Sequence, residues 1–178
     1  MSTTTCCTVL VLLLTSLATS ASADQLLLSR VRGVDARARS LIEEALWRSG
    51  TFQRMVVEVA ASDLIVYVSR TALDGTLRGA LRFVGAGADG GRYLLVELND
   101  EPGDGLDAPS DRLAGIATLA HELQHALEVA GATDVQDPES FEAFYTEVAA
   151  SHRHDVVDTL AARQAGAQVY FEMTGRKQ

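Results

Sequence analysis

The chain is poor in cysteine and in aromatic side chains. Aromatic residues make up 6% of it, and its two cysteines, Cys6 and Cys7, both lie in an N-terminal segment that we expect to be removed as a signal peptide. The mature chain would then have no disulfide bond and no thiolate metal ligand. Any metal site in it must therefore use histidine, aspartate and glutamate side chains.

The sequence also lacks an apolar run long enough to span a bilayer comfortably. The longest N-terminal run extends from Val9 to Ala18, whereas a membrane helix needs roughly 20 apolar residues. Ala21-Ser22-Ala23 follows with the small residues of a signal-peptidase site, although no lysine or arginine precedes the run. We expect residues 1–23 to be a cleaved signal peptide and residues 24–178 to form one exported domain, periplasmic or extracellular.

Basic residues are scarce relative to acidic ones. The 15 lysines and arginines against 24 aspartates and glutamates give a formal net charge of -9. A domain of this charge is repelled by nucleic acids and by anionic membrane surfaces. The composition therefore predicts neither a nucleic-acid partner nor a membrane partner after signal cleavage.

Helical spacing of apolar residues recurs along the chain. Two such segments precede a β-rich region, and three follow it. The predicted helices cover residues 35–49, 51–62, 110–131, a segment that opens at Asp137-Pro138, and about 155–173.

Three short apolar runs in the middle of the chain predict strands: LIVYVS (64–69), ALRFVG (80–85) and RYLLVELN (92–99). Turns rich in glycine and aspartate separate them, which is typical of an antiparallel meander. The loop GAGADGG matches the glycine spacing of a dinucleotide site, but a strand follows it instead of a helix, so we interpret it as a hairpin loop. The sequence thus predicts an α+β domain with two N-terminal helices, a three-stranded antiparallel meander and three further helices.

The motif HELQH, residues 121–125, lies within the long predicted helix. His121 and His125 are four residues apart, so their side chains project from one face and can share a metal ion. Two neutral imidazoles are typical ligands of Zn²⁺, which acidifies a bound water. Glu122 lies about 100° further round the helix, where its carboxylate can act as the general base for that water.

The motif is specific for a single sequence. With the histidine and glutamate content of this chain, roughly 0.005 accidental matches to H-E-x-x-H are expected. The alternative interpretation is a pair of histidines with only a structural role on an amphipathic helix.

His121-Glu122-Leu123-Gln124-His125 resembles the motif of the HExxH zinc metallopeptidases, the zincins. The order of strands, motif helix and later helices is also similar to a compact zincin domain. Glu128 stands where the extended metzincin motif has a glycine, and what remains is similar to the gluzincins, whose third zinc ligand is a carboxylate on a later helix. LAHELQHALE and the helix after it resemble a group of small exported bacterial proteins.

This resemblance implies that Asp158 is the third zinc ligand, because it falls where those relatives carry a glutamate. Small residues follow it on one face of the predicted last helix and would let that helix pack closely against the motif helix. Close packing would bring the short aspartate side chain to a ligand distance of about 2.0–2.2 Å. Glu147 is the rival carboxylate, and His152 and His154 are further candidates.

The leading hypothesis is therefore an exported zinc metallopeptidase that hydrolyses peptide or protein substrates, with Glu122 as its catalytic base. In zincins an edge strand beside the active helix pairs with extended substrate, so the resemblance implies that RYLLVELN has this role. Tyr145, His152 or His154 could stabilise an oxyanion beside the zinc.

Two other functions fit the same sequence. One is a binding module whose zinc holds helices together without catalysis, since zinc sites closed by four protein ligands are structural and catalytic ones keep an open position. The other is an exported helical domain without metal. No feature of the sequence specifies a substrate or an oligomeric state.

Overall fold

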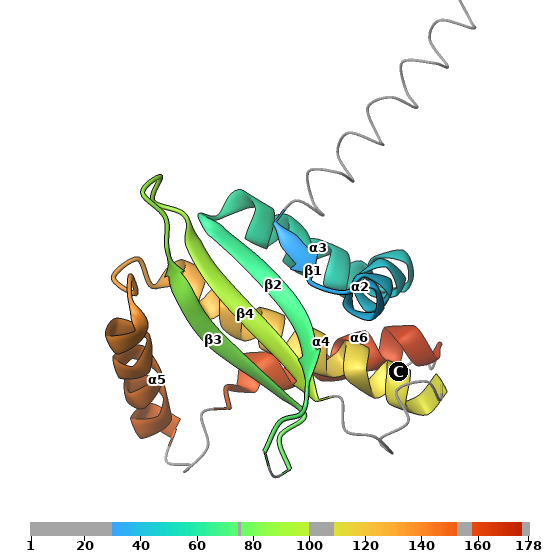
Figure 1. Cartoon of the computed structure of the whole chain (residues 1–178). Coiled ribbons are helices and arrows are strands. Elements are labelled where there is room, and N and C mark those ends of the chain that lie inside the picture. Colours follow the sequence, from blue (N-terminus) through green and yellow to red (C-terminus); the bar gives the residue numbers. More distant parts are fainter. Residues whose placement is uncertain (1–29, 75, 100–108, 153–157, 176–178) are drawn as a thin grey trace, which may run out of the picture.

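A computed structural model describes residues 30–74, 76–99, 109–152 and 158–175 (Figure 1). The expected signal peptide, residues 1–23, lies outside the described residues. In chain order, the elements are β1 (Val31–Gly33), α2 (Ala36–Arg48), α3 (Gly50–Ala61), β2 (Leu64–Thr71), β3 (Gly79–Ala86), β4 (Arg92–Asn99), α4 (Pro109–Gly131), α5 (Pro138–His152) and α6 (Leu160–Thr174). The α+β class expected from the sequence is confirmed.

The two N-terminal helices begin and end where their capping residues predict. Asp35 accepts a hydrogen bond from the backbone N–H of Ala38 at 2.8 Å and so caps α2. Ser49 ends α2 and also begins α3, where its hydroxyl oxygen accepts from the N–H of Phe52 at 3.0 Å. The predicted helices at 35–49 and 51–62 are therefore confirmed.

The sheet is mixed, so the expected antiparallel meander is wrong. Its strand order is β1-β2-β4-β3, with β1, β2 and β4 parallel and only β3 antiparallel to its neighbour β4. The α2–α3 pair forms the crossover that a parallel β1–β2 connection needs. The short runs indicate strands but not their partners, and β1 was missed because it has only three residues.

The third predicted strand is β4, and it lies inside the sheet. It pairs along its full length with β2 on one side and with β3 on the other. Its inward side chains Leu94, Val96 and Leu98 are all buried, which fits a central strand. The prediction that RYLLVELN is an edge strand free to pair with substrate is therefore wrong. The edge strand beside it is β3.

The GAGADGG segment forms the turn between β3 and β4, as predicted. Gly90 adopts a positive φ of 81°, and the N–H of Gly87 donates to the carbonyl of Gly91 at 2.7 Å. Only glycine takes this backbone conformation without strain, so the turn explains the glycines without a nucleotide site.

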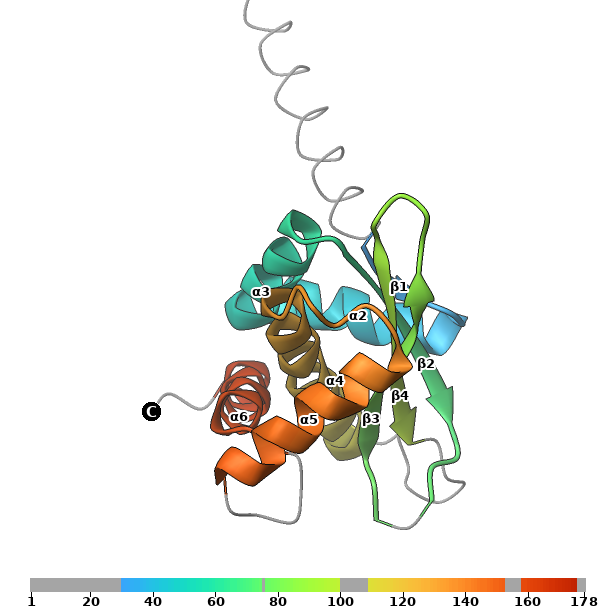
Figure 2. The same cartoon turned by 90° about the vertical axis from the view of Figure 1, so that its left-hand side faces the viewer.

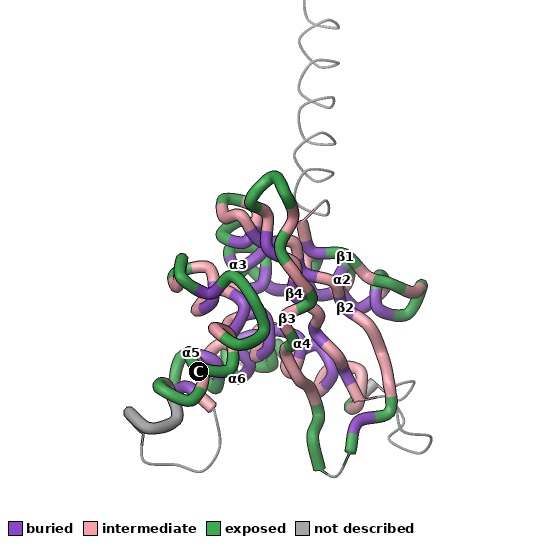
Figure 3. The backbone as a smooth tube through the Cα atoms, turned by 60° about the vertical axis from the view of Figure 1, so that its left-hand side comes forward, coloured by how far each residue is buried: buried purple, intermediate pink, exposed green. Residues whose placement is uncertain are grey.

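Helices α3, α4 and α6 lie on one side of the sheet, as the two views at right angles show (Figures 1 and 2). The central helix α4 contacts β2, β3 and β4 as well as α6. Its buried Ile116, Leu119 and Leu123 belong to one apolar core with the inward side chains of the sheet. Figure 3 shows the tip of the β3–β4 hairpin exposed and α4 largely buried.

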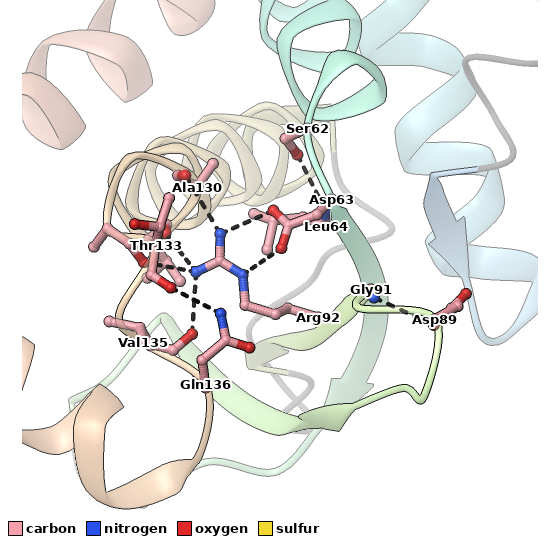
Figure 4. A network of polar contacts seen from close by, with 12 residues as sticks. Ser62, Asp63, Leu64, Asp89, Gly91, Arg92, Ala130, Thr133, Val135 and Gln136 are labelled. Atoms are coloured by element: carbon pink, nitrogen blue, oxygen red, sulfur yellow. Dashed lines mark hydrogen bonds and ion pairs between the residues drawn. The ribbon is translucent and has the colours of Figure 1, made fainter.

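A buried arginine fixes the C-terminal end of α4 to the sheet (Figure 4). Arg92, at the start of β4, is 1% exposed and forms a two-pronged ion pair with Asp63 at 2.6 and 2.8 Å. Its guanidinium also donates to the carbonyls of Val129, Ala132 and Val135 at 2.9, 2.7 and 3.1 Å. Val129 lies in the last turn of α4, and Ala132 and Val135 follow the helix, so Arg92 adds a charged donor at and just beyond the C-terminal end of α4 and complements the helix dipole.

In the described part of the chain, no helix has the length and apolarity that crossing a membrane requires.

Candidate metal centre

The two motif histidines lie side by side on α4. His121 and His125 have ring centroids 4.9 Å apart and planes inclined by 77°. This is the arrangement expected for residues one helical turn apart, and it turns both rings toward the same space.

Asp158 completes a group of three potential metal ligands. One ligand atom from each of His121, His125 and Asp158 lies within 4.8 Å of the other two. The Nε2 atom of His121 is 3.5 Å from Oδ1 of Asp158. The structure therefore brings together the three residues that the sequence singles out as ligands.

Asp158 reaches this place from a segment that is not helical. The last helix was expected to begin near Asp155, but α6 begins at Leu160 and is capped by Thr159, whose hydroxyl accepts from the N–H of Ala162 at 3.1 Å. Thr159 therefore marks the start of the helix, more than one turn later than the apolar spacing predicts, because its side chain caps the first free N–H groups.

A glycine lets α6 approach α4 closely beside the histidines. A Cβ atom added at Gly166 would lie 2.9 Å from the carbonyl oxygen of Ala117 and 3.4 Å from Cβ of His121. Ala162, on the same side of α6, is also buried. The expected close packing of small residues is present, and it involves Ala162 and Gly166, four and eight residues after Asp158 in the chain.

The residues present fit a divalent cation. Oδ1 of Asp158 is buried without a hydrogen-bond partner, which is costly for a carboxylate that has no cation beside it. Burial lowers the pKa of His121 and the neighbouring His125 lowers it further, against the opposite influence of Asp158 and Glu128. A neutral imidazole is the form that ligates metal, so this environment favours the ligand form of His121.

Contacts with Glu128 and Tyr145 hold His125 in place. Its Nδ1 lies 2.8 Å from Oε2 of Glu128, and the Tyr145 hydroxyl donates to its backbone carbonyl at 3.3 Å. The tyrosine ring also meets the imidazole edge to face, with centroids 5.7 Å apart. Only 4% of His125 is exposed, so its ring has one orientation with Nε2 directed away from Glu128.

Glu122 has the environment of a proton-transfer group. It is 7% exposed. Burial raises the pKa of its carboxyl to about 7, while His125 lowers it and Asp158 raises it to smaller extents. Gly79 of β3 packs directly on it, since a Cβ there would lie 2.8 Å from Oε1. A carboxyl with this pKa can both accept and return a proton near neutral pH.

These side chains line a pocket of about 710 Å³ between β3, α4 and α6. The start of β3 forms one wall, and the pocket contains His121, Glu122, His125, Tyr145, Asp158 and Arg163. The guanidinium of Arg163 is 3.9 Å from Oδ2 of Asp158. This volume is in the range of pockets that bind small molecules or short peptide segments.

The other candidates for the third metal ligand do not belong to this group in the described part of the chain. Glu147 is exposed on α5 and is not among the three clustered ligands. His154 and the side chain of His152 lie outside the described residues. Tyr145 lines the pocket, and burial raises the pKa of its phenol, so it stays protonated at neutral pH.

Sequence reasoning missed the roles of Glu128 and Thr159. Their side chains join through a hydrogen bond of 2.6 Å, with the threonine hydroxyl donating to Oε1 of the carboxylate. The helical spacing of three residues between His125 and Glu128 is the signal that could have indicated the first contact. Nothing local in the sequence indicates the second.

Comparison with protein-family models, with curated proteins and with solved structures finds no match to this chain.

Proposed function

We propose that this chain is an exported, zinc-dependent peptidase of the zincin type. The proposal is carried by one observation: HELQH presents two histidines whose ligand atoms lie within 4.8 Å of a carboxylate oxygen of Asp158, and Glu122 lines the same pocket. Two imidazoles and a carboxylate are a donor set that zinc prefers. Bound zinc would lower the pKa of a coordinated water to about 7 and polarise a substrate carbonyl.

Two side chains of this chain would supply proton transfer and stabilisation of the oxyanion. Glu122 is buried and has a pKa of about 7, so it takes a proton from the attacking water and delivers it to the leaving amine. The Tyr145 hydroxyl, which donates only to the His125 carbonyl at 3.3 Å among the described residues, lines the pocket and can donate to a developing oxyanion.

Strand β3 is the proposed place for the substrate backbone. It pairs only with β4 among the described strands, and its first residues line the pocket, while α5 contacts it further along, where Phe141 meets Phe83. An extended peptide can add to such an edge through main-chain hydrogen bonds. The close approach of Gly79 to Glu122 places the edge next to the catalytic carboxyl.

Three clustered ligands beside an accessible pocket support catalysis over a structural role. Among the described residues, the group contains three protein ligands, and a structural zinc site has four. A fourth position open to the pocket is what a hydrolytic site needs for water and substrate.

Substitution of the proposed base tests this function. Glu122→Gln keeps the shape of the side chain and leaves the three ligands untouched, so the protein should still bind one equivalent of zinc. Peptide cleavage should fall by about 10²–10⁴-fold, the usual contribution of a general base. The assay is cleavage of a peptide library followed by mass spectrometry, with Glu142→Gln on exposed α5 as the matched control. Equal cleavage by the parent and the Glu122 variant would refute the proposal.

A further inference from the structure

We propose that Glu128 and Thr159 are positioning residues of the metal centre, which form a bridge from His125 on α4 to the chain segment that carries Asp158. The bridge sets the distance between the two ligands that come from different elements. This inference rests on the metal site proposed above, but it concerns metal affinity and does not require peptidase activity.

The geometry of the bridge uses each oxygen of the Glu128 carboxylate once. Oε2 lies 2.8 Å from Nδ1 of His125, and Oε1 accepts from the Thr159 hydroxyl at 2.6 Å. The side chain of Glu128 is 18% exposed and Thr159 is 8% exposed, so water competes little for either contact.

The contact with Glu128 orients the His125 ring for metal binding. Nδ1 of the ring faces Oε2 of Glu128 at 2.8 Å, so the opposite nitrogen, Nε2, is the one that can face a metal ion. A histidine held in this way is the common arrangement behind metal ligands.

The other end of the bridge fixes Asp158. Thr159 follows Asp158 directly in the chain, and its hydroxyl also accepts from the N–H of Ala162, which makes it the first capping residue of α6. The Thr159 side chain thus joins the start of α6 to Glu128 on α4, directly after the proposed third ligand in the chain. Among the described residues, the other side chains near the Asp158 carboxylate are His121, with Nε2 at 3.5 Å, and Arg163, with its guanidinium at 3.9 Å.

The protein contains a matched structure away from the metal centre. Ser49 caps α3 and donates its hydroxyl hydrogen to Oε2 of Glu172 at 2.6 Å, the same pairing of a capping hydroxyl with a glutamate. Ser49→Ala therefore removes the same kind of interaction as Thr159→Ala but lies outside the pocket. A merely structural role would make the two variants equivalent.

The test measures zinc affinity by competition with a chromogenic chelator, and the melting temperature of the metal-free protein as a separate readout. Glu128→Gln should weaken zinc binding by about 10–100-fold, the usual effect of removing a group behind a ligand. Thr159→Ala should weaken it by about 10-fold, and Thr159→Ser should restore it. Ser49→Ala should lower the melting temperature and leave zinc affinity unchanged.

The double variant Glu128→Gln with Thr159→Ala should bind zinc no more weakly than Glu128→Gln alone, because both changes break one bridge. Unchanged zinc affinity in Thr159→Ala, or an equal loss in Ser49→Ala, would overturn the inference. If the variants show the expected zinc affinities but the parent protein cleaves no peptide, the bridge is supported and the proposed peptidase function is refuted. Absence of zinc from the parent protein would overturn both.

Discussion

At the scale of single residues, Asp158 has the least satisfied polar atom of the site. Its Oδ1 is buried without a hydrogen-bond partner, and its Oδ2 is 3.9 Å from Arg163. The Asp158 side chain is 32% exposed and its Oδ1 is 3.5 Å from Nε2 of His121, so a cation between the carboxylate and the two imidazoles would satisfy an oxygen that has no hydrogen bond. Asp158 should therefore matter more for metal affinity than for folding.

Asp158→Ala should lose zinc at stoichiometric concentrations, because the remaining two imidazoles are a poor site by themselves. Its metal-free melting temperature should stay close to that of the parent, because the Asp158 side chain is 32% exposed and its Oδ1 makes no hydrogen bond. Elemental analysis after gel filtration measures the zinc. Glu147→Ala, which removes an exposed carboxylate on α5, is the control and should retain one equivalent. Retained zinc in the Asp158 variant with loss in the Glu147 variant would reverse this ligand assignment.

The site residues differ in how far the sequence can indicate them. His121, Glu122 and His125 follow from helical geometry alone, because their relation is set within two turns. Asp158 was indicated by resemblance, and the structure places it in the group but before α6 instead of on it. The contact of Thr159 with Glu128 joins residues 31 positions apart, so only the packing of α6 on α4 reveals it.

At the scale of elements, a glutamate on α6 holds the start of α3. Glu172 accepts from the Ser49 hydroxyl at 2.6 Å, from the Thr51 hydroxyl at 2.6 Å and from the Thr51 N–H at 3.1 Å. Burial opposes ionisation of Glu172, but these hydrogen bonds, with one from Gln168, outweigh it and lower its pKa to about 2. A negative charge at a helix N-terminus also complements the helix dipole.

This contact predicts how the free energy of unfolding depends on pH. The folded-state pKa of Glu172 is below its unfolded value of 4.5, so its contribution is complete above pH 4.5 and is lost as the pH falls toward about 2. Glu172→Gln should lower the free energy of unfolding at pH 7 by about 1–2 kcal/mol after allowance for solvent screening. Urea titrations between pH 7 and pH 2 measure it.

The difference between the parent and the Glu172 variant should shrink across that acid range. Glu58→Gln, at an exposed position of α3, should follow the parent at every pH. A constant difference down to pH 2 would show that the carboxylate charge of Glu172 is not what holds α3.

The elements were easier to predict than their arrangement. Apolar spacing and capping residues are local, so α2 and α3 were placed to within a residue or two. The order of the strands depends on which faces the helices cover, and β4 takes the centre because its alternate side chains fill the core. The hairpin between β3 and β4 was predicted, whereas the parallel pairing of β4 with β2 is a long-range outcome.

At the scale of the whole molecule, the proposed metal site joins α4 to the segment before α6, so metal binding there would be linked to folding. Zinc at 100 times its dissociation constant should stabilise the folded state by about 2.7 kcal/mol. For a domain of this size, that corresponds to a rise of roughly 5–10 °C in melting temperature, measured by scanning calorimetry. His125→Ala should show no rise. Complete unfolding on chelation would instead indicate a structural zinc site.

The arginine that joins β4 to the end of α4 also bears on the order of assembly. Its hydrogen bonds connect Arg92 to carbonyls 37, 40 and 43 positions later in the chain. Closing loops of this length costs entropy that is recovered only when the sheet is already formed. Arg92 stands at the start of β4 and its partner Asp63 just before β2, so we expect the end of α4 to be held only once these two strands have paired. A chain that is still folding would then expose His121 and His125 without Asp158 beside them, and the proposed three-ligand site would be complete only as one of the last steps of maturation.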